Sequence, residues 1–130
     1  TWVVGLGAIS VSVFINLVIL YFAKGFLGIP ADFVALRGLT VVLFTIIGAF
    51  VATLEFWILT RFLKRSIHTF QVIALVVLIL SIIPHIRSIL SPPDLDIPLS
   101  ATLIGGLFIL FHITTASVCI GFLSKLTKLE

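Results

Sequence analysis

Residues 38–60 read GLTVVLFTIIGAFVATLEFWILT, in which Glu55 is the only charged residue. An apolar run of about 20 residues has the length of an α-helix that crosses a hydrocarbon layer about 30 Å thick. Three further runs are similarly apolar, so the four predicted spans cover residues 2–22, 38–60, 69–90 and 99–123. The sequence therefore predicts an all-α, polytopic membrane protein with a single domain (residues 1–130), folded as an antiparallel bundle of four transmembrane helices.

The composition supports this class of protein. Hydrophobic residues make up 61% of the chain, charged residues 10%, and the mean hydropathy is +1.38. A soluble domain has roughly half apolar and about a quarter charged residues. The net charge of +3 comes from basic residues at the ends of the predicted helices, whereas nucleic-acid binding requires them on one solvated face. We therefore expect the lipid bilayer as the main partner and no nucleic acid.

Prolines occur in the predicted third connection and once inside the predicted third span. Pro84 lies inside that span, where a helix continues or kinks if neighbouring groups satisfy the freed carbonyl. Residues 91–98 read SPPDLDIP, and three prolines cannot propagate a helix. The chain begins at Thr1 and has no Met, so we expect residues before Thr1 to have been removed or left out.

The distribution of basic residues predicts the orientation. With four spans, both termini and the second connection share one face, which carries the basic cluster Arg61, Lys64 and Arg65 as well as Lys125 and Lys128. The other face combines three basic with three acidic residues: Lys24, Arg37, Arg87, Asp32, Asp94 and Asp96. Lys and Arg accumulate in short cytoplasmic loops. We therefore expect a cell-membrane protein with both termini in the cytoplasm.

Each predicted span carries a stripe of small or polar residues at steps of three or four. Such residues allow close helix packing and hydrogen bonds between helices in lipid, so all four stripes are expected to face the bundle interior. The stripes are Gly5, Ala8, Ser12 and Asn16; Thr45, Gly48, Ala52 and Glu55; Gln71, Ala74, Leu78, Ser81 and His85; and Gly105, Ile109, His112, Ala116 and Cys119.

Six polar residues within the spans are candidate functional residues, because polar groups in lipid are costly and often functional. Asn16, Ser81 and His85 are predicted in the outer half, His112 near the midplane, and Glu55 and Gln71 towards the cytoplasm. Glu55 could carry protons with His112 as the next station. The structural alternative is a carboxylate that pairs with Arg61 or reaches the interface.

His112 is also the candidate for cofactor binding. A neutral imidazole in a dry bundle core ligates the metal of a haem or chlorin readily. His85 is expected well above His112 and His68 at the membrane edge, so only single axial ligation is open. The structural alternative is a histidine that hydrogen-bonds across helices. We predict no required cofactor and no metal site, and keep a tetrapyrrole at His112 as an alternative.

Nothing in the sequence indicates a catalytic centre. Cys119 and His112 are the only nucleophile and base that could pair, and seven residues of helix separate their backbones by about 10.5 Å. Cys119 is better explained as a small packing residue. We predict no catalytic residues and lean towards a protein that is not an enzyme.

Two stretches carry a family resemblance. Residues 70–84 (FQVIALVVLILSIIP) and 110–116 (LFHITTA) resemble small bacterial four-helix membrane proteins of an uncharacterised domain-of-unknown-function family. The resemblance implies a four-helix fold and a bacterial source, and it implies no activity or catalytic residues. His85 and Arg87 make this chain more polar after Pro84 than the family pattern.

Three hypotheses for function follow. The first is a non-enzymatic membrane protein that acts through helix contacts, as a homo-oligomer or as a small subunit or assembly partner of a larger membrane complex. The second is a small transporter or proton pathway that uses Glu55 and His112. The third is a haem- or chlorophyll-type pigment-binding subunit centred on His112.

Overall fold

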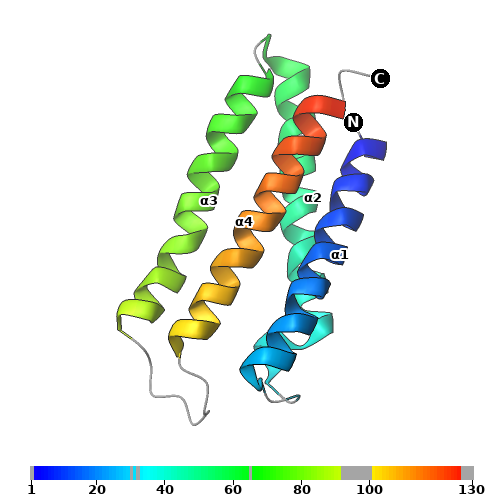
Figure 1. Ribbon diagram of the computed structural model, residues 1–130. Coiled ribbons are helices and arrows are strands. Elements are labelled where there is room, and N and C mark those ends of the chain that lie inside the picture. Colours follow the sequence, from blue (N-terminus) through cyan, green and yellow to red (C-terminus); the bar gives the residue numbers. More distant parts are fainter. Residues whose placement is uncertain (1, 30, 32, 65, 92–100, 127–130) are drawn as a thin grey trace.

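The computed structural model describes residues 2–29, 31, 33–64, 66–91 and 101–126. These form four long α-helices and one short 3-10 turn: α1 (Trp2–Leu27), η1 (Val34–Leu36), α2 (Gly38–Phe62), α3 (Ser66–Leu90) and α4 (Ala101–Leu126). Consecutive long helices run in opposite directions (Figure 1). All four are long and apolar enough to cross a membrane, and the described residues contain no strand. The all-α prediction is therefore confirmed.

The start of α1, the end of α4 and the connection between α2 and α3 lie at one end of the bundle, which we call the terminal end (Figure 1). The connection between α1 and α2 lies at the other end, called the loop end. Helix α1 runs five residues beyond its predicted end and stops before Gly28, whose φ of +62° suits a glycine after a helix C-terminus. Helix α3 passes through Pro84 and continues to Leu90, as expected. Most of the predicted third connection lies outside the described residues.

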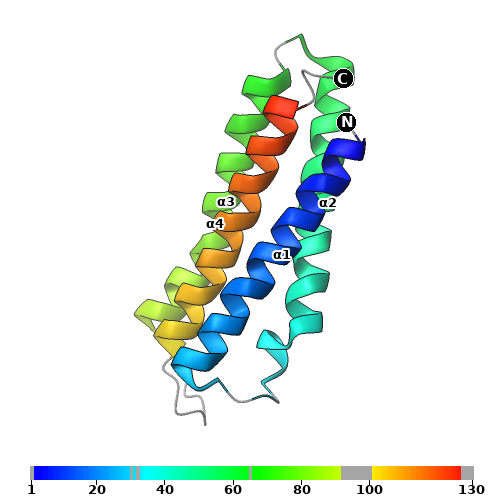
Figure 2. The ribbon, with the colours of Figure 1, turned by 45° about the vertical axis from the view of Figure 1, so that its right-hand side comes forward.

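The four helices do not pack equally. Helix α1 lies against α2 and α4, whereas α3 packs mainly on α4 and more weakly on α2. The two views agree that α3 and α4 run side by side (Figures 1 and 2). Among the described side chains of α3 only Phe70 is fully buried, and its ring meets that of Phe56 edge-on at 4.9 Å. The bundle is thus tight around α1 and looser between α2 and α3.

Two apolar clusters form the core, one towards each end. The loop-end cluster is Leu20, Ile29, Leu36, Val41, Ile104, Leu107 and Phe111. The terminal-end cluster is Val4, Ala8, Ala49, Phe56, Phe70, Cys119 and Leu123. The buried polar side chains of Asn16 and Thr45 lie between the two clusters. The middle of the bundle is therefore its polar part.

The predicted inward stripe is correct for α1, where Gly5, Ala8, Ser12 and Asn16 are all buried. The Thr53 side chain of α2 occupies the space that a side chain at Gly5 would need, so only glycine permits this approach. In α4, Gly105 and Cys119 are buried and His112 is half-buried. The striped faces of α1 and α4 therefore point towards the bundle interior, as the spacing of their small residues predicts.

The predicted stripe of α2 is correct at Thr45, which is buried, and wrong at Gly48. Gly48 is exposed, and no atom lies within 4 Å of a Cβ placed on it. The core face of α2 is instead Val41, Thr45, Ala49, Thr53 and Phe56. Helix α2 has small residues on two adjacent faces. The face that also carries Phe56 packs inward, because the Phe56 ring fills the space next to Phe70.

Candidate functional site

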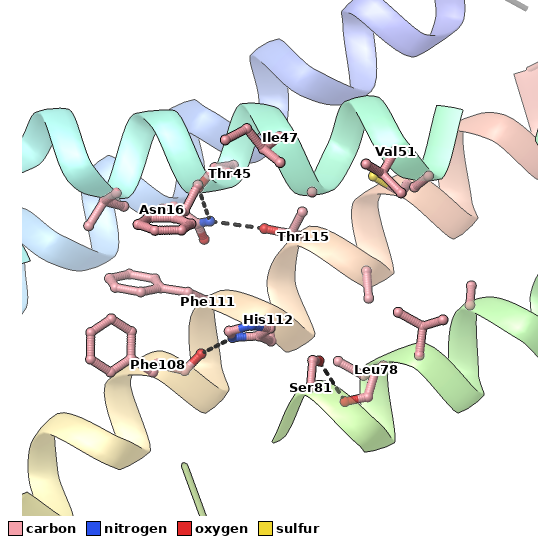
Figure 3. A pocket seen from close by; sticks show the side chains of 18 of the residues that line it. Asn16, Thr45, Ile47, Val51, Leu78, Ser81, Phe108, Phe111, His112 and Thr115 are labelled. Carbon is pink, nitrogen blue, oxygen red and sulfur yellow. Dashed lines mark hydrogen bonds between the residues drawn. The ribbon is translucent and has the colours of Figure 1, made fainter. Parts of the chain in front are cut away.

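A cavity of about 650 Å³ lies between α2, α3 and α4 and reaches Asn16 of α1 (Figure 3). Its wall along α2 runs from Thr40 to Glu55, which corresponds to about 22 Å of helix. Exposed residues of α2 and α3 line the cavity, namely Gly48 and Val51 of α2 and Val77 of α3. The cavity therefore opens to the outside between α2 and α3, which pack less closely than the other neighbouring helices.

Asn16 and two threonines form a hydrogen-bond network between helices at the inner wall. The amide nitrogen of Asn16 donates to the hydroxyls of Thr45 (2.9 Å) and Thr115 (3.0 Å), so α1, α2 and α4 are joined at one level (Figure 3). The amide oxygen is buried and has no hydrogen-bond partner. If the amide were turned over, the oxygen would accept from the threonines and the NH₂ group would be left over. In either orientation Asn16 keeps an unused polar atom.

His112 and His85 lie together in the cavity. Their ring centroids are 5.0 Å apart, and the His85 ring also stacks on Phe108 at 5.1 Å. The expectation that His85 lies well above His112 is therefore wrong. The number of residues between each histidine and its membrane face does not determine how far α3 is shifted along α4, and the contact between the two rings depends on that shift. The backbone carbonyl of His85 comes close to Gly105, which has no side chain to hold the two helices apart.

The environment of His112 defines its hydrogen-bonding state. Its Nδ1 lies 2.8 Å from the carbonyl oxygen of Phe108, one turn earlier in α4 (Figure 3). A carbonyl only accepts, so Nδ1 carries a hydrogen, and in the uncharged ring Nε2 is then a bare acceptor. Two imidazoles on opposite sides of one haem iron would stand further apart than these two rings. The observed pair does not sandwich a haem.

Ser81 adds a third polar group from α3 to the same cavity. Its hydroxyl donates to the carbonyl of Leu78 (2.8 Å), so its oxygen keeps only the capacity to accept. Polar side chains from all four helices thus reach this middle level of the bundle.

Glu55 lines the opposite end of the cavity and is not near His112. Ten residues of α2 separate it from Thr45, and His112 lies about one turn beyond Thr115 in the other direction. The two side chains are therefore about 20 Å apart along the bundle axis. Between them the α2 wall of the cavity consists of Ile47, Gly48, Val51 and Ala52. Oε1 of Glu55 is buried without a hydrogen-bond partner.

The other predicted residues lie outside this cavity. Gln71 is exposed on α3. The prediction that it faces the bundle interior is therefore wrong. Arg61 and Lys64 of the basic cluster are exposed at the terminal end, and the guanidinium of Arg61 lies 5.4 Å from the centre of the Trp57 ring. Arg65 lies outside the described residues.

Sequence reasoning did not single out Thr45 and Thr115 as the partners of Asn16. Thr45 is part of a predicted stripe, but Thr115 is one of two adjacent threonines that point about 100° apart around the helix axis, and the sequence does not indicate which of them faces Asn16. The available signal was Asn16 itself, since a buried amide in lipid requires partners on other helices.

The described residues contain no group of three His, Cys, Asp or Glu side chains that could hold a metal ion. Cys119 is buried within the terminal-end cluster, which agrees with a packing role.

No protein-family model, no curated protein and no solved structure matches the chain. The resemblance to a bacterial four-helix family is not supported by these comparisons.

Proposed function

We propose that this chain is a multi-pass membrane protein that binds a small lipid-soluble ligand in the cavity between α2, α3 and α4. The observation that carries the proposal is that cavity, which combines a largely apolar wall with a few polar groups from different helices at one level. Sites for small molecules have this character, and their volumes run from about 300 to 1,000 Å³.

The position of the opening supports a ligand that enters from the bilayer. The surfaces on either side of it are apolar, with Leu43, Phe44 and Ile47 exposed on α2 and Val76 and Leu80 exposed on α3. In a membrane these side chains face acyl chains. A ligand that is dissolved in the bilayer can therefore reach the cavity without crossing a polar surface.

Helix docking is the second candidate function, and one observation favours it. Gly48 and Ala52 lie four residues apart on α2; Gly48 is exposed with open space beside it, and Ala52 is half-buried. Small residues four apart are a common contact surface between membrane helices. This pair of small residues supports the hypothesis that the chain is a homo-oligomer or a subunit of a complex, whose interface would be the opening between α2 and α3.

The proton-pathway hypothesis has less support from the geometry. Its two principal groups, Glu55 and His112, lie about 20 Å apart along the axis, and the α2 wall is apolar for about 15 Å of that distance, from Thr45 to Glu55. A relay across that distance would depend on a chain of water molecules.

The first experiment compares Gly48→Leu with Gly106→Leu. Both glycines are exposed, a Cβ added to either would have no atom within 4 Å, and only Gly48 lines the cavity. Each protein is extracted from its own membrane in mild detergent and weighed by native mass spectrometry. We expect a bound small molecule on the wild type and on Gly106→Leu, and its loss from Gly48→Leu.

The other outcomes separate the candidates. A second protein or a second copy that is lost only from Gly48→Leu would support helix docking instead. A bare monomer in all three samples would contradict ligand binding. Visible absorption of the wild-type complex would show that the bound molecule is a pigment, and its mass would decide whether it is a tetrapyrrole.

A further inference from the structure

We infer that the ligand carries a hydroxyl group, and that His112 Nε2 accepts the hydrogen bond from it. This inference rests on the proposed function, because it specifies the chemistry of the molecule in the same cavity.

The first step is the state of His112. Its Nδ1–H is occupied by the Phe108 carbonyl at 2.8 Å, so the remaining ring nitrogen of the uncharged side chain can only accept. His112 is half-buried and lines the cavity, so a bound molecule can reach this nitrogen.

The second step is that one neighbouring polar atom, the Ser81 oxygen, has the same character. The Ser81 hydroxyl has already donated its hydrogen to Leu78, so its oxygen can only accept. His85 adds one donor and one acceptor. His112 Nε2 and the Ser81 oxygen are therefore two acceptors at the middle level that have no hydrogen to donate.

The third step is the consequence for the ligand. A molecule with only carbonyl or ether oxygens would place an acceptor against His112 Nε2 and leave that nitrogen unpaired. A cationic amine would donate, but the carboxylate of Glu55 lies about 20 Å away along the axis. An uncharged alcohol or phenol satisfies His112 without bringing a charge into the bilayer.

The apolar part of such a molecule has a defined place. From the His112 level the cavity continues towards Glu55 between Gly48 and Ala52 of α2 and Leu78 of α3. The absence of a side chain at Gly48 leaves room there for a hydrocarbon chain or ring.

The test uses para-heptylphenol and its methyl ether, para-heptylanisole, on the purified full chain in lipid nanodiscs. The two probes have similar shape and apolar surface, but only the phenol can donate. We expect the phenol to bind at least about tenfold more tightly, because a site built to bond a hydroxyl discriminates against the analogue that lacks it. His112→Leu should abolish this preference, and His112→Gln, which offers an amide oxygen, should restore part of it.

Gln71→Leu is the matched control, since Gln71 is an exposed polar residue outside the cavity and its loss should leave the preference unchanged. Equal binding of both probes to the wild type would overturn this inference and leave the proposed ligand site standing. Binding of neither probe would overturn both. A phenol preference that survives in His112→Leu would overturn the role of His112. The wild-type comparison requires no variant, so a misfolded mutant does not decide the result.

Discussion

At the scale of single residues, Asn16 is a polar side chain that joins three helices. It is 1% exposed and donates to threonines on two other helices. Hydrogen bonds between membrane helices contribute about 0.6 kcal/mol each on average, because the separated helices also find partners. Asn16 therefore sets how α1, α2 and α4 are placed relative to one another more than it sets overall stability.

A double-mutant cycle with Asn16→Leu and Thr115→Val should measure that contribution. We expect a coupling free energy of about 0.6 kcal/mol, obtained from unfolding in mixed detergent micelles. Ser10→Ala is the control partner, because the Ser10 hydroxyl donates to the carbonyl of Leu6 within its own helix. Its coupling to Thr115→Val should be close to zero. Coupling equal to that control would show that the Asn16–Thr115 contact does not form.

At the scale of elements, α3 is held by its contact with α4. A side-chain carbon on Gly105 would lie 2.9 Å from a carbon of Ile89 and 3.1 Å from the backbone oxygen of His85. The close approach at Gly105 brings the His85 ring next to His112. The geometry of the candidate site therefore depends on one glycine that contacts no ligand in our proposal.

Gly105→Leu should push α3 away from α4 and lower the free energy of unfolding by about 1–3 kcal/mol. It should also separate His85 from His112, which a spin label on each helix would detect as a longer distance. Gly106→Leu is the control, since it lies one residue further on a face with nothing within 4 Å. Equal stability of the two variants would contradict the close packing at Gly105.

At the scale of the whole molecule, the direction of insertion follows from charge. The terminal end carries the exposed Arg61 and Lys64. Because short loops rich in Lys and Arg stay in the cytoplasm, we propose that the terminal end is cytoplasmic. The α1–α2 connection, with the exposed Ala31, would then face the other side.

Cysteine labelling of intact cells would test this orientation. Ala31→Cys should react with a membrane-impermeant maleimide added outside, and Lys64→Cys should react only after the cells are opened. The single native cysteine, Cys119, is buried and should contribute little background. Labelling of Lys64→Cys in intact cells, with Ala31→Cys protected, would reverse the proposed orientation.

The candidate site could be predicted in part. Asn16, Ser81, His85 and His112 stand out in the sequence because polar residues are rare in these spans. Their arrangement could not be predicted, because it depends on the shift of α3 along α4. Glu55 stood out for the same reason, yet the structure places it at the far end of the cavity.

The sequence by itself determined that the chain forms four long apolar helices, since that follows from the length and composition of each run. It also determined the buried face of α1, where Gly5 to Asn16 form a single stripe of small and polar residues. Only the tertiary structure decided which face of α2 is buried, that His85 meets His112, and that a cavity opens between α2 and α3. The physical reason is that a helix apolar on every side carries little information about its partner, so packing between particular side chains makes the choice.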